Sequence, residues 1–148
     1  MLLRALYRYL KQAGMPYALG TVVDALGNQQ HITRALIRLF HLLHDPAFGT
    51  DRAAALQAAD DAIVTSLAQV TSIDEDRIIR LYHAVIHACL RTNFFLDSGR
   101  LALAFKLDSA KVPGLPKPLP WREIWVYSQR VEGIHLRSGP VARGGLRW

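Results

Sequence analysis

The spacing of apolar residues changes between residues 92 and 101, and this change limits the fold more than any other feature of the chain. Up to about residue 92, apolar side chains recur every three or four residues, which is typical of amphipathic helices. From Leu101 to Leu107 they alternate with smaller or charged residues, which indicates a strand. The sequence therefore predicts an α+β fold in which an all-α helical module precedes the first strands of a sheet.

Helical periodicity predicts helices over residues 2–13, 18–26, 30–44, 51–70 and 72–92. Gly14 and Pro16 are expected to end the first helix. Ser72 and Glu75 have the spacing of a capping box, in which the serine oxygen and the glutamate each satisfy a free backbone donor at the start of the last helix. That helix carries apolar lines on two sides, so we expect it to be the central helix of the module.

Three strands are expected in the remaining residues. Residues 123–128 hold four contiguous apolar side chains and are predicted to be buried on both faces, and residues 131–137 form the next strand. Between the first strand and these two, residues 113–120 contain four of the seven prolines, which predicts a stiff connector. The expected division is a helical module at 1–96, a strand and proline-rich connector at 97–120 and the start of a further domain at 121–148. A few strands without partners predict a domain cut through its first third.

The net charge of +6 belongs entirely to the C-terminal third of the chain. Residues 1–99 carry equal numbers of basic and acidic side chains, whereas residues 100–148 carry nine Lys and Arg against Asp108, Glu123 and Glu132. This asymmetry fits a site for small anions or a nucleic-acid surface. Nucleic acid is the less favoured partner, because Trp121, Trp125 and Tyr127 follow a pattern of core residues and stacking would need them exposed.

The apolar fraction of 51% and charged fraction of 20% are typical of a folded globular protein. The single cysteine, Cys89, excludes an intramolecular disulfide framework and fits a reducing compartment, so a cytoplasmic location is expected. Cys89 lies on an apolar line of the predicted helix, where we expect it to pack as a small hydrophobic residue. No uncharged apolar run is long enough to span a bilayer, so no membrane partner is expected.

His83 and His87 are four residues apart, a spacing that can place two imidazoles on one metal ion. No Asp, Glu or Cys stands between or beside them as in the helix of a zinc protease. The histidines are therefore interpreted as core or surface residues, and no metal is expected.

The residues from Val131 to Trp148, VEGIHLRSGPVARGGLRW, combine Gly139, Gly144 and Gly145 with Arg137, Arg143 and Arg147. Glycines let backbone N–H groups approach a ligand, and guanidinium groups bind carboxylates or phosphates with two hydrogen bonds. A phosphate loop is excluded because no Lys-Ser or Lys-Thr follows the glycines. A carboxylate-binding loop and a tight turn without a ligand both remain possible interpretations.

These C-terminal residues resemble the segment that begins the catalytic region of the large bacterial NAD-specific glutamate dehydrogenases. Four earlier stretches resemble the same family in the same order: RALYRYLKQAGMPY, LRTNFF, FKLDSAKVPGLPKPLP and EIWVYSQRVEG. The resemblance implies a fragment, with part of a helical region followed by the first strands of a truncated α/β substrate domain. The competing hypothesis is a non-enzymatic anion or nucleic-acid binding module.

The resemblance also implies roles for residues. In shorter glutamate dehydrogenases a lysine directly before Gly-Gly holds the side-chain carboxylate of glutamate, and the matching position here is Arg143, before Gly144 and Gly145. The lysine has become arginine and the preceding loop is one residue longer; Arg147 would add charge or hold the loop. L-glutamate or 2-oxoglutarate is the implied ligand. The catalytic lysine and the NAD-binding domain would lie in the remainder of the same polypeptide. The isolated chain is therefore expected to be inactive. The full-length protein is expected to be a homo-oligomer.

Overall fold

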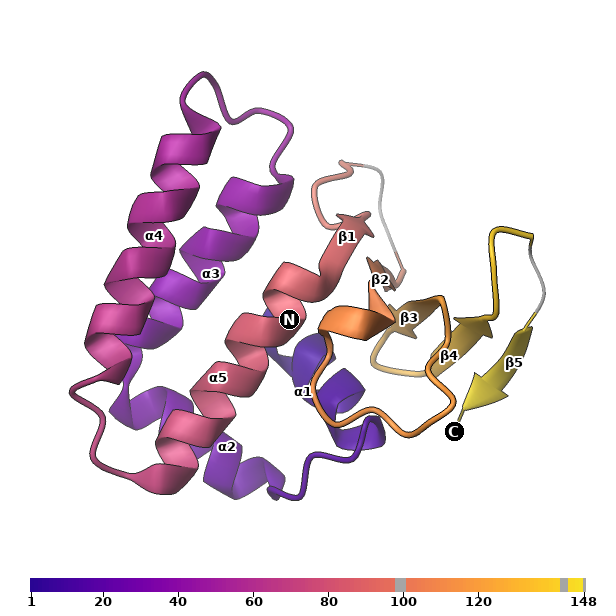
Figure 1. The fold of residues 1–148 in the computed structure, drawn as a ribbon, viewed down its shortest axis with the longest axis horizontal. Coiled ribbons are helices and arrows are strands. Elements are labelled where there is room, and N and C mark those ends of the chain that lie inside the picture. Colours follow the sequence, from indigo (N-terminus) through magenta and orange to yellow (C-terminus); the bar gives the residue numbers. More distant parts are fainter. Residues whose placement is uncertain (98–100, 142–143, 148) are drawn as a thin grey trace. The chain divides into compact units, whose positions relative to one another are not determined.

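The computed structural model describes residues 1–97, 101–141 and 144–147, in which helices precede an antiparallel sheet (Figure 1). This order confirms the predicted α+β class. The helices are α1 (Leu2–Gln12), α2 (Leu19–Asn28), α3 (Gln30–His44), α4 (Arg52–Leu67) and α5 (Ile73–Ala88), with a 3₁₀ turn, η1 (Ser109–Lys111). The strands are β1 (Cys89–Thr92), β2 (Leu103–Leu107), β3 (Arg122–Tyr127), β4 (Glu132–Arg137) and β5 (Gly144–Arg147). Among the described residues, no helix combines the length and apolarity needed to cross a bilayer.

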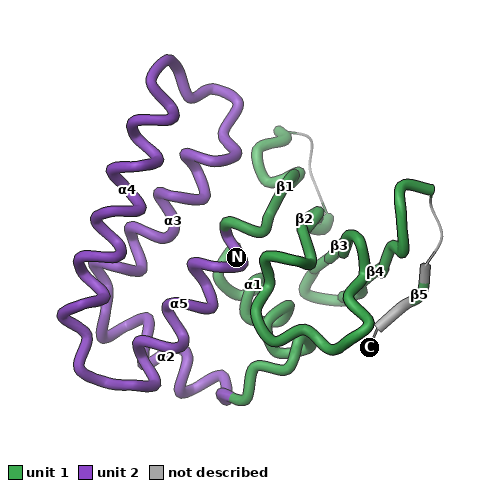
Figure 2. The backbone as a smooth tube through the Cα atoms, viewed as in Figure 1, with its two compact units in different colours: residues 1–16, 87–148 green, residues 17–86 purple. Residues whose placement is uncertain are grey.

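The chain forms two compact units, and one of them is discontinuous in sequence. Residues 17–86 make up a helical unit, whereas residues 1–16 join residues 87–148 in a unit that contains the sheet (Figure 2). The first helix is therefore part of the sheet-containing unit. The expected division at 96 and 120 stays a prediction about domains of a longer protein.

The helical unit is built on a hairpin of α3 and α4, which lie side by side (Figure 1). Ile32, Leu36 and Leu39 of α3 and Ile63 of α4 are fully buried, as the helical periodicity predicted. The loop between the two helices is fixed by Arg52, whose guanidinium donates to the carbonyls of Leu42 (2.6 Å) and Asp45 (2.7 Å). These bonds satisfy carbonyl groups at the C-terminal end of α3.

Helix α5 begins at the expected capping residue, but only half of the capping box forms. The N–H of Glu75 donates to Oγ of Ser72 at 3.3 Å, as predicted. The Glu75 carboxylate does not return to the backbone; it accepts hydrogen bonds of 2.8 Å from the side-chain amides of Asn28 and Gln29. These bonds hold the pKa of Glu75 below its usual value and connect the end of α2 to the start of α5.

The predicted extension of α5 to Thr92 is wrong, because the helix ends at Ala88 and the next four residues form β1. Cys89 and Thr92 pair with Leu107 and Phe105 of β2. The carbonyl of Ala88 accepts from the N–H of Asp108 at 2.8 Å. Pairing with residues distant in the chain thus overrides the helical periodicity of this segment.

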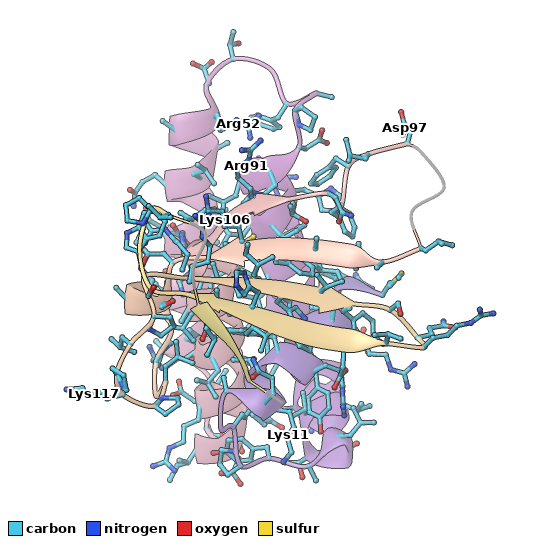
Figure 3. The ribbon with its side chains drawn as sticks, turned by 90° about the vertical axis from the view of Figure 1, so that its right-hand side faces the viewer. Lys11, Arg52, Arg91, Asp97, Lys106 and Lys117 are labelled. Atoms are coloured by element: carbon cyan, nitrogen blue, oxygen red, sulfur yellow. The ribbon has the colours of Figure 1, made fainter. Side chains whose placement is uncertain are left out.

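The sheet is an antiparallel meander in the order β1-β2-β3-β4-β5. Strands β2, β3 and β4 match the three predicted ones, and β1 and β5 provide pairing that the sequence analysis did not expect. The N-terminal limit of the first strand is Leu103 rather than Leu101. At one edge, Arg91 of β1 lies opposite Lys106 of β2 (Figure 3), so two like charges share one face of the sheet.

Only one face of β3 is fully buried, so the prediction of burial on both faces is wrong. Glu123, Trp125 and Tyr127 are buried, whereas Val126 on the opposite face is 38% exposed. Helix α1 contacts the buried face, where the indole N–H of Trp125 donates to the carbonyl of Ala5 at 3.0 Å. The apolar run of β3 therefore reflects one helix-covered face and one half-exposed face.

The proline-rich connector is confirmed as irregular chain. The Asp108 carboxylate accepts from the N–H of Ala110 and caps η1, and no regular element follows between Val112 and Trp121. Gly114 has a φ of +76°, a conformation that glycine adopts without strain, and the Lys117–Pro118 peptide bond is cis. The connector leads directly into β3.

Candidate functional site

The predicted anion-binding residues lie at the hairpin of β4 and β5. Arg137 at the end of β4 pairs with Gly144 at the start of β5, and Leu136 pairs with Gly145. The two glycines are therefore in a strand rather than in a loop. Arg143 lies outside the described residues, as does the side chain of Arg147, whose backbone pairs with Ile134.

Arg137 is held on several sides at the start of the connection to β5. One of its terminal nitrogens donates to the carbonyl of Pro140 at 2.6 Å, and its own carbonyl accepts from the N–H of Trp121 at 2.7 Å. Its guanidinium carbon lies 5.6 Å from the centroid of the Trp121 ring. A cation held in this way loses less conformational entropy when it binds an anion.

A second guanidinium, that of Arg122, lies 4.5 Å from the Trp121 ring centroid. It also forms an ion pair with Asp108 at 3.3 Å and donates to the carbonyl of Trp121. The indole thus lies within cation–π distance of both arginines. Together, Trp121, Arg122 and Arg137 form what we call the arginine–tryptophan cluster, which gives the start of the β4–β5 connection a positive charge.

This cluster was not predicted from the sequence, because Trp121 follows a pattern of core residues. Trp121 is 37% exposed, whereas Trp125 and Tyr127 are buried as expected. The sequence did contain a signal for this exposed position: Pro120 stands directly before the tryptophan and Arg122 directly after it. A tryptophan between a proline and an arginine at the start of a strand is suited to stacking on a cation.

Two glycines of this hairpin, Gly139 and Gly145, are not required by packing within the chain. A Cβ placed on Gly139 or Gly145 would meet no atom within 4 Å. Both glycines also have φ values outside the left-handed region. The space beside these two residues is therefore open, so a ligand could approach their backbone closely. A contact between a ligand and the glycine backbone stays a prediction.

His83, which the sequence analysis weighed as a metal ligand, has a carboxylate partner that sequence spacing could not reveal. Its Nε2 lies 2.8 Å from Oδ1 of Asp60, which is 23 residues away on α4. Both side chains are about one quarter exposed. The interaction is a partly buried histidine–aspartate pair joining α4 to α5, and His87 lies one turn further along α5.

Cys89 is buried, as predicted. Burial raises the pKa of its thiol to about 12, while the carbonyl of Arg91 accepts a weak hydrogen bond from it at 3.5 Å. A thiol with so high a pKa is protonated at neutral pH and is not nucleophilic. Cys89 therefore packs as a small hydrophobic residue.

Two parts of the chain match family models. The family described as bacterial NAD-glutamate dehydrogenase, catalytic domain, matches residues 62–148. The family described as glutamate dehydrogenase, helical motif 3, matches residues 1–46. The first match includes the sheet and the arginine–tryptophan cluster.

The curated relatives include three bacterial proteins that carry the name NAD-specific glutamate dehydrogenase. The protein of Halomonas elongata is 45% identical over 151 residues, which cover 99% of this chain and 9% of the relative. Those of Mycobacterium tuberculosis and Pseudomonas aeruginosa are 43% and 44% identical, cover 100% and 99% of this chain, and are each matched over 10% of their length. The chain thus spans about a tenth of the length of these relatives. Because the catalytic-domain match covers more than half of its residues, the chain belongs to the bacterial NAD-glutamate dehydrogenase family.

Proposed function

We propose that this chain is part of an NAD-dependent glutamate dehydrogenase and contributes to its glutamate-binding site. The overall reaction converts L-glutamate, NAD⁺ and water into 2-oxoglutarate, ammonium, NADH and a proton. The observation that carries the proposal is the catalytic-domain match over residues 62–148, which contains a positively charged hairpin. The names of the relatives describe the same activity.

Arg143 is proposed to bind the side-chain carboxylate of glutamate. It directly precedes β5, whose first residue pairs with Arg137, so the connection that carries Arg143 starts and ends beside the arginine–tryptophan cluster. A guanidinium can bind a carboxylate with two parallel hydrogen bonds, which fixes the orientation of the substrate. Gly144 and Gly145 would let the substrate approach the backbone, and Arg147 would contribute further charge.

NAD is proposed to bind to the remainder of the same polypeptide. A dinucleotide site of the usual kind needs parallel strands joined by a crossover helix. The described sheet is antiparallel throughout, and within it no strand is followed by an α-helix. When bound, NAD⁺ would accept the hydride, whereas the residues of this chain would bind and orient the amino acid.

The alternative function, a nucleic-acid binding module, lacks a supporting observation. Three of the four Phe, Tyr and Trp side chains in the described part of the basic third are buried and cannot stack on bases: Phe105, Trp125 and Tyr127. We further propose that the full-length protein is a cytoplasmic homo-oligomer. The buried, protonated thiol of Cys89 is compatible with a reducing compartment.

The test replaces Arg143 in the full-length enzyme. Arg143→Gln is expected to raise the KM for glutamate and to lower kcat/KM by about 100-fold, the effect of losing a charge-assisted bond of about 2.7 kcal/mol. The KM for NAD should change little, and Arg143→Lys should recover part of the loss. The matched control is Arg38→Gln, an exposed arginine of α3. Equal effects of the two glutamine variants would exclude a specific contact.

The isolated chain provides a second test. We expect the purified chain to show no glutamate-dependent reduction of NAD, because hydride transfer needs a cofactor positioned against the substrate. Activity of the isolated chain would refute this part of the proposal while leaving the family assignment intact.

A further inference from the structure

A cavity of about 630 Å³ lies beside the turn between β3 and β4, within the sheet-containing unit. It is lined by two residues of α1, Arg4 and Arg8, and by the segment from Tyr127 to Glu132. The volume lies within the range of small-molecule sites. Because β4 has six residues, the cavity is about 17 Å from the β4–β5 connection, at the other end of the strand.

The cavity walls are positively charged. Three guanidinium groups, those of Arg4, Arg8 and Arg130, line it together with a single carboxylate, that of Glu132. Arg4 and Arg8 are four residues apart on α1 and so share one face of the helix. The net charge of these lining groups is +2, which favours an anionic occupant.

Arg8 is fixed by Glu132. Its Nε donates to Oε2 at 2.8 Å, and a terminal nitrogen donates to Oε1, which gives a two-bond fork. The hydrogen bonds to Glu132 raise the pKa of Arg8 above its usual value. Since a guanidinium has five N–H donors, this fork leaves three for another acceptor.

The turn itself is also rigid. The hydroxyl of Ser128 accepts from the N–H groups of Arg130 (3.2 Å) and Val131 (2.9 Å) and donates to the carbonyl of Val131 (2.9 Å). The backbone that carries Arg130 is therefore held in place. Within the described residues, the side chains of Arg4 and Arg130 are exposed and form no ion pair.

We propose that this cavity binds a small polyanion with at least two oxyanion groups, either phosphoryl groups or carboxylates, one held by Arg4 and one by Arg130. The volume exceeds what a single inorganic anion would fill, and the two uncommitted guanidinium groups come from different elements. Arg8 positions the site and donates its remaining N–H groups. This polyanion site is separate from the proposed glutamate loop, so either can fail without the other.

The test uses the isolated chain, labelled with ¹⁵N, titrated at constant ionic strength with sodium pyrophosphate, citrate or inorganic phosphate. Pyrophosphate or citrate should shift the amide signals of residues 128–132, with a Kd of about 1 mM or lower, equivalent to about 4 kcal/mol. Inorganic phosphate should bind about 10-fold more weakly, because it offers one oxyanion group. A preference between pyrophosphate and citrate identifies the phosphoryl or carboxylate source.

The double variant Arg4→Gln/Arg130→Gln should raise the Kd at least about 10-fold. Arg34→Gln/Arg38→Gln removes the same charge from exposed positions of α3 and should change the Kd by less than about twofold. Equal weakening by both double variants would show only a general attraction of anions to a basic protein and would overturn the proposal. So would the absence of localised shifts with all three probes. The single variants Arg4→Gln and Arg130→Gln provide the same comparison if the double variant does not fold.

Discussion

The hydroxyl of Tyr9 in α1 donates a hydrogen bond to the buried carboxylate of Glu123 in β3. Tyr9 and Glu123 are both fully buried, and the Tyr9 ring lies 6.0 Å from that of Trp125. A buried carboxylate is costly unless donors surround it. This contact therefore couples the first helix to the middle strand of the sheet.

Tyr9→Phe should lower the free energy of unfolding by about 1 to 3 kcal/mol, because a buried acceptor loses one donor while the ring remains. Urea unfolding followed by tryptophan fluorescence measures this, since Trp121 and Trp125 lie in the sheet-containing unit. Tyr7→Phe is the matched control on the same helix, because no hydrogen bond of the Tyr7 hydroxyl is present among the described residues. Equal destabilisation by both variants would contradict the role of the hydrogen bond.

The free energy of unfolding should decrease as the pH is lowered from 6.5 to about 4, because His44 becomes protonated. Burial and the nearby Arg52 guanidinium lower the pKa of His44 to about 4. The folded state thus binds fewer protons than the unfolded state in this interval, so the contribution of neutral His44 is complete above pH 6.5 and is lost as the pH falls through the folded pKa. Unfolding followed by far-ultraviolet circular dichroism should give a flatter pH dependence for His44→Gln than for the wild type. His31→Gln, at an exposed position of α3, should leave the wild-type slope unchanged.

Cys89 should be unreactive in the folded protein. At about pH 8 a thiol whose pKa is about 12 is almost entirely protonated, and burial also blocks the reagent. Ellman's reagent should react with it more slowly, by a factor of about 100 or more, than with a cysteine introduced by Ala62→Cys at an exposed position of α4 in a Cys89→Ser background. Urea should abolish the difference. Rapid reaction of native Cys89 would show that β1 opens readily.

Gly145→Ala should weaken substrate binding without changing the stability of the fold. A Cβ at Gly145 would meet nothing within 4 Å. The free energy of unfolding of the isolated chain with this substitution should therefore lie within about 0.5 kcal/mol of the wild-type value. In the full-length enzyme the same change should raise the KM for glutamate if the backbone passes close to the substrate. Gly139→Ala, also free of contacts, is the control for the hairpin. An unchanged KM in the Gly145 variant would remove the glycine from the proposed site.

Local signals predicted the helices well. The first helix ends beside Gly14, whose φ is +105°, and the serine half of the capping box at Ser72 forms. The partners of Glu75 could not be predicted, because Asn28 and Gln29 lie more than 40 residues away in the chain. The strand after Ala88 escaped prediction for a related reason, since its pairing with β2 comes from tertiary contact rather than local periodicity.

Less of the candidate site could be predicted. The concentration of basic residues and the position of Gly144 and Gly145 were visible in the sequence, whereas the stacking of Arg122 and Arg137 on Trp121 depends on the pairing of β3 with β4. Glu123 was counted only as a charge, although it is a buried residue bonded to Tyr9. Alternation in a strand indicates which residues share a face, but it does not reveal which face a helix will cover.

The discontinuity of the sheet-containing unit has a consequence for synthesis on the ribosome. Helix α1 is synthesised before the strands that it contacts, and Trp125, which bonds to Ala5, follows 120 residues later. At a synthesis rate of about 5 to 20 residues per second, roughly 6 to 24 s pass between the synthesis of α1 and that of the strand that covers its apolar face. The helical unit can complete its own packing during that interval, so the apolar face of α1 stays uncovered while a segment synthesised after it folds.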